Sequence, residues 1–536
     1  MTTMPASRTI PALLDEQAEK FGEREAIVAG AQRLSYYALR QEVRRTAKGL
    51  MALGIKRGDH VAILMGNRVE WVLAFFALQQ LGATSVGLNT WATPREMEYA
   101  LVHAEVTCLI AVDQFQRNNY RAMIGGMQPR GSVLPRLRHI VWVAASALVV
   151  PAAQDGMSWD ALIAMGKDIA DERLDAMARE INADDVAMLL YTSGSTAVPK
   201  GILLQHGKWI QNAFNIGERQ KVTHADRLWL AVSLFWSFGC VNAMPNLLTH
   251  GGCVVLQEHF NSAEALSLIE RERCTIMYGT PNMVQALVEH PDRARHDLSS
   301  LRSGAMIGTP EQLMGAVNLG ATQICNVYGL SETYGNCTVS DADEPLEVRF
   351  QSVGKPLPGV TLRICDIKTG EPVSAGEVGE VRVQGLLFSA YYKDEDKTRE
   401  TFDAEGFFCT GDLGTLDDDG RLYYRGRLKE MVKSGGINIA PIEVEETLIR
   451  HPAVRSAYVI GVPDPSLDEI IVAIVILKPE ASVTADELRQ FCKKELAAYK
   501  VPTRFRFATD AELPLTTTGK LQKMKLKSLL QDTPAA

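Results

Sequence analysis

Residues 190–206 read LYTSGSTAVPKGILLQH and begin within the apolar run VAMLLY, which ends at Tyr191. Small residues let backbone N–H groups turn toward anionic oxygens, hydroxyls add donors, and a lysine supplies positive charge. The stretch therefore predicts a polyphosphate-binding loop directly after a buried strand. A Ser/Thr-rich surface turn is the alternative for this segment taken alone. The candidate phosphate contacts are Thr192, Ser193, Gly194, Ser195, Thr196 and Lys200.

This loop differs from the phosphate loop of the common nucleotide-hydrolysing proteins. The pattern GxxxxGK[ST] is missing, and Lys200 follows Pro199 rather than a second glycine. The sequence motifs of protein kinases are missing as well. A kinase-type enzyme is therefore disfavoured.

Length and net charge limit the number of structural units and the kinds of partner that we expect. A chain of 536 residues exceeds what one hydrophobic core serves, so two to four structural units are expected. A net charge of -8 argues against a general nucleic-acid or anionic-membrane binder. Small anionic molecules remain as partners.

Cysteine and histidine usage indicates a reducing compartment without a transition metal. The 9 cysteines include no CxxC, and the 10 histidines form no HxxxH or HExxH. The N-terminus lacks a secretory pattern, and the most apolar stretch, residues 141–153, is too short to span a bilayer and contains a proline. We therefore expect a cytoplasmic protein with no transmembrane segment and read that stretch as a strand.

The chain alternates helical and strand patterns from Leu34 to about Val112. Helical stretches precede HVAILM, TSVGL and TCLIAV, which is typical of βαβ units on a doubly wound parallel sheet. Thr93, Pro94 and Glu96 supply N-cap, N1 and N3 for a helix. Residues 113–185 are expected to be irregular connections. After the phosphate loop, runs such as CVVLQ and QICNVYG predict a second α/β layer.

From Val353 onward the pattern changes to alternating apolar residues, as in GEVGEVRVQG, and predicts a small barrel or sheet. Asp419-Gly420 is a hairpin-turn signal. The tail from about Lys429 has its own helix and strand pattern, with a capping box at Thr484 and Glu487. Roughly a hundred residues are enough to hold a separate core.

NVYGLSET, residues 326–333, places an aromatic ring, a hydroxyl and a carboxylate together. Tyr328 can stack on a purine, Ser331 can bind phosphate, and Glu332 can hold Mg²⁺ through oxygen. A strand-to-helix turn capped by Ser331 or Thr333 is the alternative.

Three later motifs add charged groups. Asp412 in TGD offers two acceptors to a ribose diol, Arg427 precedes two lysines and a Gly-Gly turn, and Lys520 follows a Thr-rich loop in LPLTTTGKLQK. Each lysine taken alone is more often a solvated charge.

Together these motifs resemble the adenylate-forming superfamily of acyl-CoA synthetases, adenylation domains and luciferases. The resemblance runs from about residue 10 to residue 525, and the ordered set of motifs is specific. It implies an α/β fold: a large N-terminal region, residues 1–427, of two α/β sheets plus a β-barrel, which binds ATP and acid. Residues 428–536 would form a small mobile α+β C-terminal domain.

The resemblance implies an acyl-CoA ligase that activates a carboxylic acid with ATP and Mg²⁺ as its acyl-AMP and transfers the acyl group to coenzyme A. The alternative is an adenylating enzyme that loads a separate carrier protein or forms an amide. A catalytically silent nucleotide binder is a third possibility, which the late Lys520 speaks against. Coenzyme A is the expected acceptor because no carrier-protein motif follows Lys520 in this sequence. A homodimer is left open.

The resemblance also assigns roles to residues. Lys520, Glu332 and Thr192 would be catalytic, with Glu332 holding Mg²⁺. Besides the loop, ATP would contact Gly304, Ala305, Asn326, Tyr328, Gly329, Ser331, Asp412 and Arg427. The acid would contact Trp236, Phe238, Ser303, Thr333, Tyr334 and Gly335. The domain hinge and the segment for thioester formation would be Lys429, Lys433, Ser434, Gly435 and Gly436.

Three positions depart from the commonest family pattern. Ala197 stands where a glycine is usual, Asp468 stands where another glycine is usual, and Trp236 replaces a frequent histidine or smaller aromatic. The bulk of Trp236 favours a compact cyclic, aromatic or medium-chain acid over a long chain.

Overall fold

The computed structural model describes residues 3–127, 130–144, 156–192, 199–434, 437–464, 467–515 and 521–530. It divides into two compact units. The first comprises Met1–Thr361 and Val383–Phe408, and the second comprises Leu362–Arg382 and Cys409–Ala536. The mobile domain assigned to residues 428–536 is a statement about motion and stays a prediction.

A seven-stranded sheet in the first unit contains the predicted βαβ units. Its order is β11-β10-β4-β3-β5-β8-β9, and every neighbouring pair is parallel except β10 with β11. The strands are β3 (His60–Leu64), β4 (Thr84–Gly87), β5 (Cys108–Val112), β8 (His139–Val143), β9 (Met157–Ser158), β10 (Val186–Thr192) and β11 (Lys200–Gln205). The predicted doubly wound α/β architecture is confirmed.

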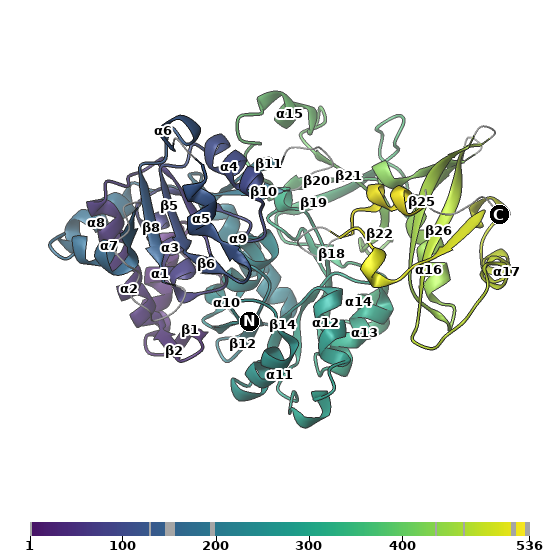
Figure 1. Ribbon diagram of the computed structural model, residues 1–536, viewed down its shortest axis with the longest axis horizontal. Helices are drawn as coiled ribbons and strands as arrows, with labels where there is room; N and C mark the ends of the chain where they lie inside the picture. Colours follow the sequence, from purple (N-terminus) through teal and green to yellow (C-terminus); the bar gives the residue numbers. More distant parts are fainter. Residues whose placement is uncertain are drawn as a thin grey trace. The chain divides into compact units, whose positions relative to one another are not determined.

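Local signals place the helices beside this sheet. The Ser35 side chain accepts from Ala38 N and starts α2 (Tyr36–Ala52). The predicted capping box of Thr93 and Glu96 is present at α4 (Pro94–His103). Helix α3 (Val69–Gln80) is buried along almost its whole length, because it packs on β3 and β4 on one side and on α2 on the other (Figure 1).

A nine-stranded sheet forms the second layer of the first unit, in the order β18-β17-β16-β15-β14-β12-β13-β1-β2. Strand β1, close to the N-terminus, pairs in parallel with β13, more than two hundred residues later. The strands are β1 (Glu25–Ala29), β2 (Gln32–Ser35), β12 (Arg227–Leu230), β13 (Cys253–Leu256), β14 (Ile276–Tyr278), β15 (Ser303–Met306), β16 (Gln323–Tyr328), β17 (Thr338–Val339) and β18 (Lys355–Pro356). The second α/β layer is confirmed, but the N-terminal segment also contributes to it.

The expectation that residues 113–185 are irregular is wrong for much of that stretch. It contains β8 and β9 of the seven-stranded sheet, α5 (Tyr120–Gly125), α7 (Trp159–Met165) and α8 (Asp171–Arg179). Helices α7 and α8 are short and bury little: only Leu162 in one and Leu174 in the other. Such weak apolar patterns escape periodicity analysis. Of the apolar stretch 141–153, the first residues belong to β8, and residues 145–153 lie outside the described residues.

The remaining helices of the first unit cover the two sheets or connect their strands. Helix α9 follows β11 directly and contacts α10. The helices are α1 (Ile10–Phe21), α9 (His206–Gln220), α10 (Met244–His250), α11 (Ser262–Arg271), α12 (Pro281–Val288), α13 (Pro310–Asn318), α14 (Leu346–Gln351) and α15 (Glu395–Glu400). Among the described residues, we find no helix with the length and apolarity needed to cross a membrane.

Two smaller sheets have most of their residues in the second unit. A four-stranded sheet runs β19-β20-β21-β22, and the predicted hairpin turn at Asp419-Gly420 is present, with Gly420 at φ 77°. The other sheet runs β24-β23-β26-β25, with β27 beside β26. The strands are β19 (Val360–Cys365), β20 (Gly379–Gly385), β21 (Phe408–Leu416), β22 (Leu422–Arg427), β23 (Val432–Ser434), β24 (Ile437–Ile439), β25 (Val454–Asp464), β26 (Asp468–Leu477) and β27 (Arg504–Phe507). Closure of the first sheet into a barrel stays a prediction.

The C-terminal part of the second unit has its own core, as predicted from the sequence. Val432, Val459, Val475 and Leu488 are fully buried in it. Helix α16 (Pro441–Ile449) packs on β25 and contacts α17 (Ala485–Glu495), which starts at the predicted capping box of Thr484.

Candidate active site

The two ends of the predicted phosphate loop are joined by the sheet. Thr192 ends β10, Lys200 begins β11, and the two are register partners in the antiparallel pair. The loop predictions Ser193, Gly194, Ser195 and Thr196 lie outside the described residues. Thr192 and Lys200 are therefore neighbours at the base of the hairpin, where the paired strands end and the loop begins.

Helix α4 supports the base of this loop. Tyr99 Oη donates to the Pro199 carbonyl at 3.3 Å, and His103 Nδ1 lies 2.8 Å from Tyr191 Oη. Burial, together with the charge of Lys393, lowers the pKa of His103. An uncharged imidazole therefore lies beside Tyr191 of β10, and sequence analysis did not single out Tyr99 or His103.

The predicted metal ligand and the predicted phosphate lysine meet at Tyr391. Tyr391 Oη donates to Glu332 Oε1 at 2.9 Å, and Lys200 Nζ lies 5.0 Å from the centroid of the Tyr391 ring. Burial raises the pKa of Tyr391, and so does the charge of Glu332. The phenol therefore stays protonated and donates to the carboxylate across the neutral pH range.

Backbone hydrogen bonds hold Tyr391 in this place. Phe388 N donates to the Glu332 carbonyl at 2.8 Å, and Leu203 N of β11 donates to the Ala390 carbonyl at 3.1 Å. The segment 388–391 thus lies between Glu332 and the strand that begins at Lys200. No sequence signal pointed to Tyr391, because its partner Glu332 is 59 positions away in the chain.

The residues predicted to hold adenine lie at the end of β16. Asn326 is buried, its Nδ2 donates to the Ser352 carbonyl at 3.1 Å, and its Oδ1 accepts from Val327 N. Tyr328 is 7% exposed. The Asn326 amide therefore holds the following loops in place, and its predicted contact with adenine stays a prediction.

Two glycines among the predicted ATP contacts permit close backbone approach. Gly304 on β15 has φ 140°, and a Cβ there would lie 1.9 Å from the Met277 carbonyl. A Cβ on Gly329 would lie 2.3 Å from the Gly335 carbonyl. Any side chain at either position would push the backbone segments apart, and the neighbouring Ala305 is fully buried.

The predicted acid-binding residues Trp236 and Phe238 lie in an aromatic cluster. The half-buried Trp236 ring is 5.4 Å from Trp91 and 5.4 Å from Phe235, and Phe238 lies 4.9 Å from Tyr278. Beside them, Ser331 Oγ donates to Ser237 Oγ at 3.2 Å. The segment that carries Trp236 is thereby attached to the loop that carries Ser331 and Glu332.

The other predicted acid contacts make bonds within the fold. Thr333 Oγ1 accepts from Leu330 N at 2.9 Å and donates to the Leu330 carbonyl, so the turn-capping interpretation holds for it. Ser303 Oγ donates to the carbonyls of Gln220 and Gln323. Their contact with an acid stays a prediction.

Tyr334 and Gly335 form a strained corner next to this turn. Tyr334 has φ 56°, and its carbonyl accepts from Asn242 Nδ2 at 2.6 Å and Asn212 Nδ2 at 2.8 Å. A Cβ on Gly335 would meet Asn242 Oδ1 at 2.3 Å. The two asparagines stabilise the corner. Sequence analysis missed both because each is far from Tyr334 along the chain.

The predicted ribose ligands of the second unit face each other across two strands. Asp412 on β21 and Arg427 on β22 are register partners, with Arg427 Nε 3.4 Å from Asp412 Oδ1. Asp412 is only 4% exposed. A carboxylate has two acceptor oxygens, which suits the binding of two hydroxyls.

The hinge and thioester predictions are consecutive elements of the second unit. Lys429 lies in the turn Leu428–Glu430, and Lys433 and Ser434 lie on β23. Lys433 N donates to Glu469 Oε2 at 2.9 Å, and Ser434 pairs with Asp468. Gly435, Gly436, Ala197 and the catalytic candidate Lys520 lie outside the described residues.

The donor set of the first unit fits a nucleotide with a divalent cation. Glu332 supplies carboxylate oxygen, the ligand that Mg²⁺ prefers, and Lys200 supplies a cation suited to phosphate. The hydroxyl of Tyr391 donates a hydrogen bond to this carboxylate. The site can therefore offset the negative charge of a polyphosphate.

Comparison with known families supports this chemistry. A family model described as AMP-binding enzyme matches residues 14–392, and a model described as AMP-binding enzyme C-terminal domain matches residues 443–520. The first matched segment contains the phosphate loop and NVYGLSET, and the second ends at Lys520, whereas TGD and Arg427 lie between the two segments.

Relatives of similar length match along nearly the whole chain. The putative acyl-CoA synthetase YngI of Bacillus subtilis is 35% identical over 97% of this chain and 96% of its own. The mitochondrial medium-chain acyl-CoA ligase ACSF2 of Mus musculus is 30% identical over 98% of this chain and 88% of its own. The crystal structure of the anthranilate CoA ligase AuaEII in complex with anthranoyl-AMP has a TM-score of 0.81 at 28% identity, covering 98% of both chains.

Proposed function

Since this chain belongs to the family of AMP-binding enzymes and is an AMP-forming acyl-CoA ligase, we propose that its first unit joins ATP to a compact carboxylic acid. The second unit then supplies groups for each of two steps. In the first step an oxygen of the acid attacks the α-phosphorus, and pyrophosphate leaves. In the second step the thiol sulfur of coenzyme A attacks the acyl carbon, and AMP leaves.

The observation that best supports the proposal is that two predicted site residues contact the same tyrosine. Lys200 begins β11, Glu332 follows β16, and both contact Tyr391. Negative charge builds on the phosphoryl oxygens and on the departing pyrophosphate during the first step. A lysine and a metal-binding carboxylate held by the same side chain are suited to offset that charge, since such catalysis depends on positioning and electrostatics.

Glu332 would hold Mg²⁺, and the backbone and hydroxyl of Thr192 with Lys200 would hold the β- and γ-phosphates. When bound, Mg²⁺ supplies positive charge between phosphate oxygens. The protein's own contribution is to keep the carboxylate oriented and the loop base closed. The Thr192 and Lys200 register pair and the bond from Tyr99 to the Pro199 carbonyl support that role.

The ribose would be bound by Asp412, which Arg427 accompanies. Lys520 would bridge the acid carboxylate and the α-phosphate in the first step. The C-terminal domain would then turn about Lys429 and present the stretch around Lys433, Ser434, Gly435 and Gly436 to coenzyme A. The turn Leu428–Glu430, which interrupts the strands β22 and β23, is consistent with a hinge there.

The acid would lie against Trp236. Its half-buried ring packs against those of Trp91 and Phe235, and the three rings would form a bulky aromatic wall of the acid site. Such a wall suits a compact cyclic, aromatic or medium-chain acid. Relatives that act on medium-chain acids and on anthranilate, by their names, support this range.

A cytoplasmic location is part of the proposal. Buried thiols such as Cys108, Cys240 and Cys274 are typical of a reducing compartment. Measuring the distribution of the tagged full chain after cell fractionation tests this location.

A panel of carboxylic acids tests the substrate class. The full chain is incubated with ATP, Mg²⁺ and coenzyme A, and AMP release is measured for short, medium, long, cyclic and aromatic acids. We expect the highest kcat/KM for compact acids. A preference for acids longer than about twelve carbons would overturn the role given to Trp236 and leave the ligase reaction intact.

Two lysine variants test the division between the steps. We expect Lys520→Ala to lower acid-dependent pyrophosphate exchange about 10²-fold to 10³-fold, because one contact to developing charge is typically worth that much. It should spare thioester release from supplied acyl-AMP. Lys429→Pro restricts φ at the hinge and should show the reverse pattern. Equal loss of both activities in each folded variant would rule out alternation.

A further inference from the structure

Tyr391 contacts two groups of the active site at once, and no motif of the sequence assigned it a role. The side chain is 5% exposed. Its hydroxyl bonds Glu332 Oε1 at 2.9 Å, and its ring lies 5.0 Å from the ammonium of Lys200. One residue thus touches both a carboxylate suited to Mg²⁺ and a cation suited to phosphate.

The surroundings leave Tyr391 little freedom. Its ring is 4.8 Å from that of Phe388, and its backbone N–H donates to Thr398 Oγ1 at 3.0 Å. Ser389 N donates to the Leu203 carbonyl at 3.0 Å, which fixes the segment to β11. A phenol has few rotatable bonds, so its hydroxyl and its ring face stay in fixed directions.

These two contacts act in different ways. A hydroxyl that donates to one carboxylate oxygen sets the rotation of the carboxylate and so the direction in which it meets a cation. A ring face attracts an ammonium by a cation–π contact and limits where the lysine head can lie. We propose that Tyr391 is a positioning residue for acyl-AMP formation, which orients Glu332 for Mg²⁺ through its hydroxyl and seats Lys200 for the polyphosphate through its ring.

The proposal rests on the function given above, and it separates the two half-reactions. Pyrophosphate is present in the first step and has left before the thioester step. Tyr391 therefore matters for acid-dependent pyrophosphate exchange and does not matter for thioester release from supplied acyl-AMP. A purely structural residue would affect both activities together.

A graded set of variants tests each contact. Tyr391→Phe keeps the ring and removes the hydroxyl, and Tyr391→Leu removes both. Tyr392→Phe is the matched control, because that neighbouring hydroxyl donates to Glu105 Oε2 at 3.2 Å and touches neither Glu332 nor Lys200 by any described bond. Each variant is checked by thermal melting against the unaltered chain.

We expect Tyr391→Phe to raise the Mg²⁺ concentration for half-maximal pyrophosphate exchange about tenfold to a hundredfold, as for other groups that orient metal ligands. The KM for ATP at saturating Mg²⁺ should change little. Tyr391→Leu should raise the KM for ATP as well, because Lys200 loses its cation–π contact with the ring. Thioester release from supplied acyl-AMP should match the unaltered chain in both variants, and Tyr392→Phe should leave every value unchanged.

Binding without turnover gives a second measurement. The affinity for Mn²⁺ in the presence of a nonhydrolysable ATP analogue is measured by electron paramagnetic resonance. We expect this affinity to fall in Tyr391→Phe and not in Tyr392→Phe. In a double-mutant cycle with Glu332→Gln, the two losses of Mn²⁺ affinity should not add, because the Tyr391 hydroxyl acts on the metal only through the Glu332 carboxylate. If Tyr391→Phe has a lower melting temperature, the cycle is measured below that temperature. The loss of Mn²⁺ affinity in Glu332→Gln alone is then the value with which the double variant is compared.

Unchanged Mg²⁺ dependence and Mn²⁺ retention in a folded Tyr391→Phe would overturn the inference, as would additive losses in the cycle. Failure of the proposed function looks different. In that case the unaltered chain itself forms no AMP from ATP with any acid of the panel, whatever the residue at position 391.

Discussion

Arg427 Nε lies 3.4 Å from Asp412 Oδ1, and the two residues are register partners, Asp412 within β21 and Arg427 at the end of β22. They come from separate motifs, TGD and GRLKEM, yet the hairpin brings them together. The pair links a nearly buried carboxylate to a half-exposed guanidinium, with side-chain exposures of 6% and 45%. This arrangement gives Asp412 a cationic neighbour and leaves Arg427 in contact with solvent.

We expect Asp412→Asn to raise the KM for ATP in pyrophosphate exchange by about tenfold or more. A charged acceptor for the ribose hydroxyls becomes a neutral one, and a hydrogen bond to a charged group is worth about 1.5–3 kcal/mol. Asp418→Asn, at an exposed position in the following turn, is the control. If both variants keep the KM of the unaltered chain, Asp412 does not bind the nucleotide.

Trp236→Ala is expected to shift the acid preference toward bulkier acids and to leave the KM for ATP unchanged. The ring lies in the wall formed with Trp91 and Phe235. Truncating a large aromatic residue commonly costs about 3 to 5 kcal/mol when it is fully buried, so the melting temperature must be measured alongside the acid profile. An unchanged profile with a large loss of stability would place Trp236 in the core.

Lys523→Met is expected to destabilise the C-terminal part of the second unit by about 3 kcal/mol. Lys523 Nζ lies 2.8 Å from Glu445 Oε1 and 3.2 Å from Glu430 Oε2. Burial raises the pKa of Glu445, which Lys523 counteracts. Removing one partner leaves a buried carboxylate without its cation, which is strongly destabilising.

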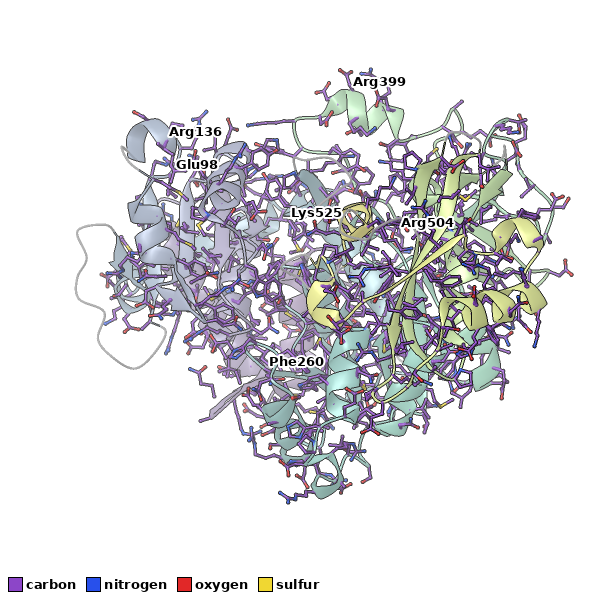
Figure 2. The ribbon with its side chains drawn as sticks, turned by 45° about the vertical axis from the view of Figure 1, so that its right-hand side comes forward. Glu98, Arg136, Phe260, Arg399, Arg504 and Lys525 are labelled. Carbon is purple, nitrogen blue, oxygen red and sulfur yellow. The ribbon has the colours of Figure 1, made fainter. Side chains whose placement is uncertain are left out.

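Lys525→Met is the matched control for Lys523→Met. Lys525 is exposed on the same short helix, Lys523–Leu530, and is labelled in Figure 2. Urea unfolding of both variants, with limited proteolysis to identify the second unit, gives the comparison. Equal unfolding midpoints in the two variants would show that the buried ion pair contributes nothing.

The stability of the first unit should fall as the pH drops from about 6.5 toward 4, in part because of His206. Burial lowers the pKa of His206 from 6.5 to about 4. Its Nδ1 accepts the N–H of Ile10 at 3.2 Å, which only the neutral ring can do. Between the two pKa values the unfolded chain binds a proton that the folded chain does not, so folding loses up to about 3 kcal/mol over this range.

His206→Gln should flatten this part of the pH profile, because glutamine does not titrate. Melting temperatures of both chains at pH 7, 6, 5 and 4.5 provide the measurement. The prediction fails if the variant loses stability with the same slope as the unaltered chain.

Local signals predicted the elements well. Thr caps followed by Glu predicted α4 and α17, and short apolar runs separated by helical patterns predicted β3, β4 and β5. These features depend on residues within a few positions of each other. The apolar run before the phosphate loop also predicted a strand there, and β10 ends at Thr192.

Long-range pairing could not be predicted in the same way. Strand β1 joins the second sheet beside β13, because its buried apolar residues find a partner there that nothing near it in sequence reveals. Tyr391 and the asparagines that hold the Tyr334 carbonyl were missed for the same reason. A single buried tyrosine or asparagine carries no pattern, and only the folded chain shows what it touches.

Analysis of the nucleotide products tests the central claim most directly. The full chain is incubated with ATP, Mg²⁺, coenzyme A and the best acid of the panel, and AMP, pyrophosphate and acyl-CoA are quantified together. We expect all three in equal amounts, with no AMP when the acid is omitted. Release of ADP and phosphate, or acid-dependent AMP with the acyl group passed to a holo-carrier protein and never to coenzyme A, would contradict the account.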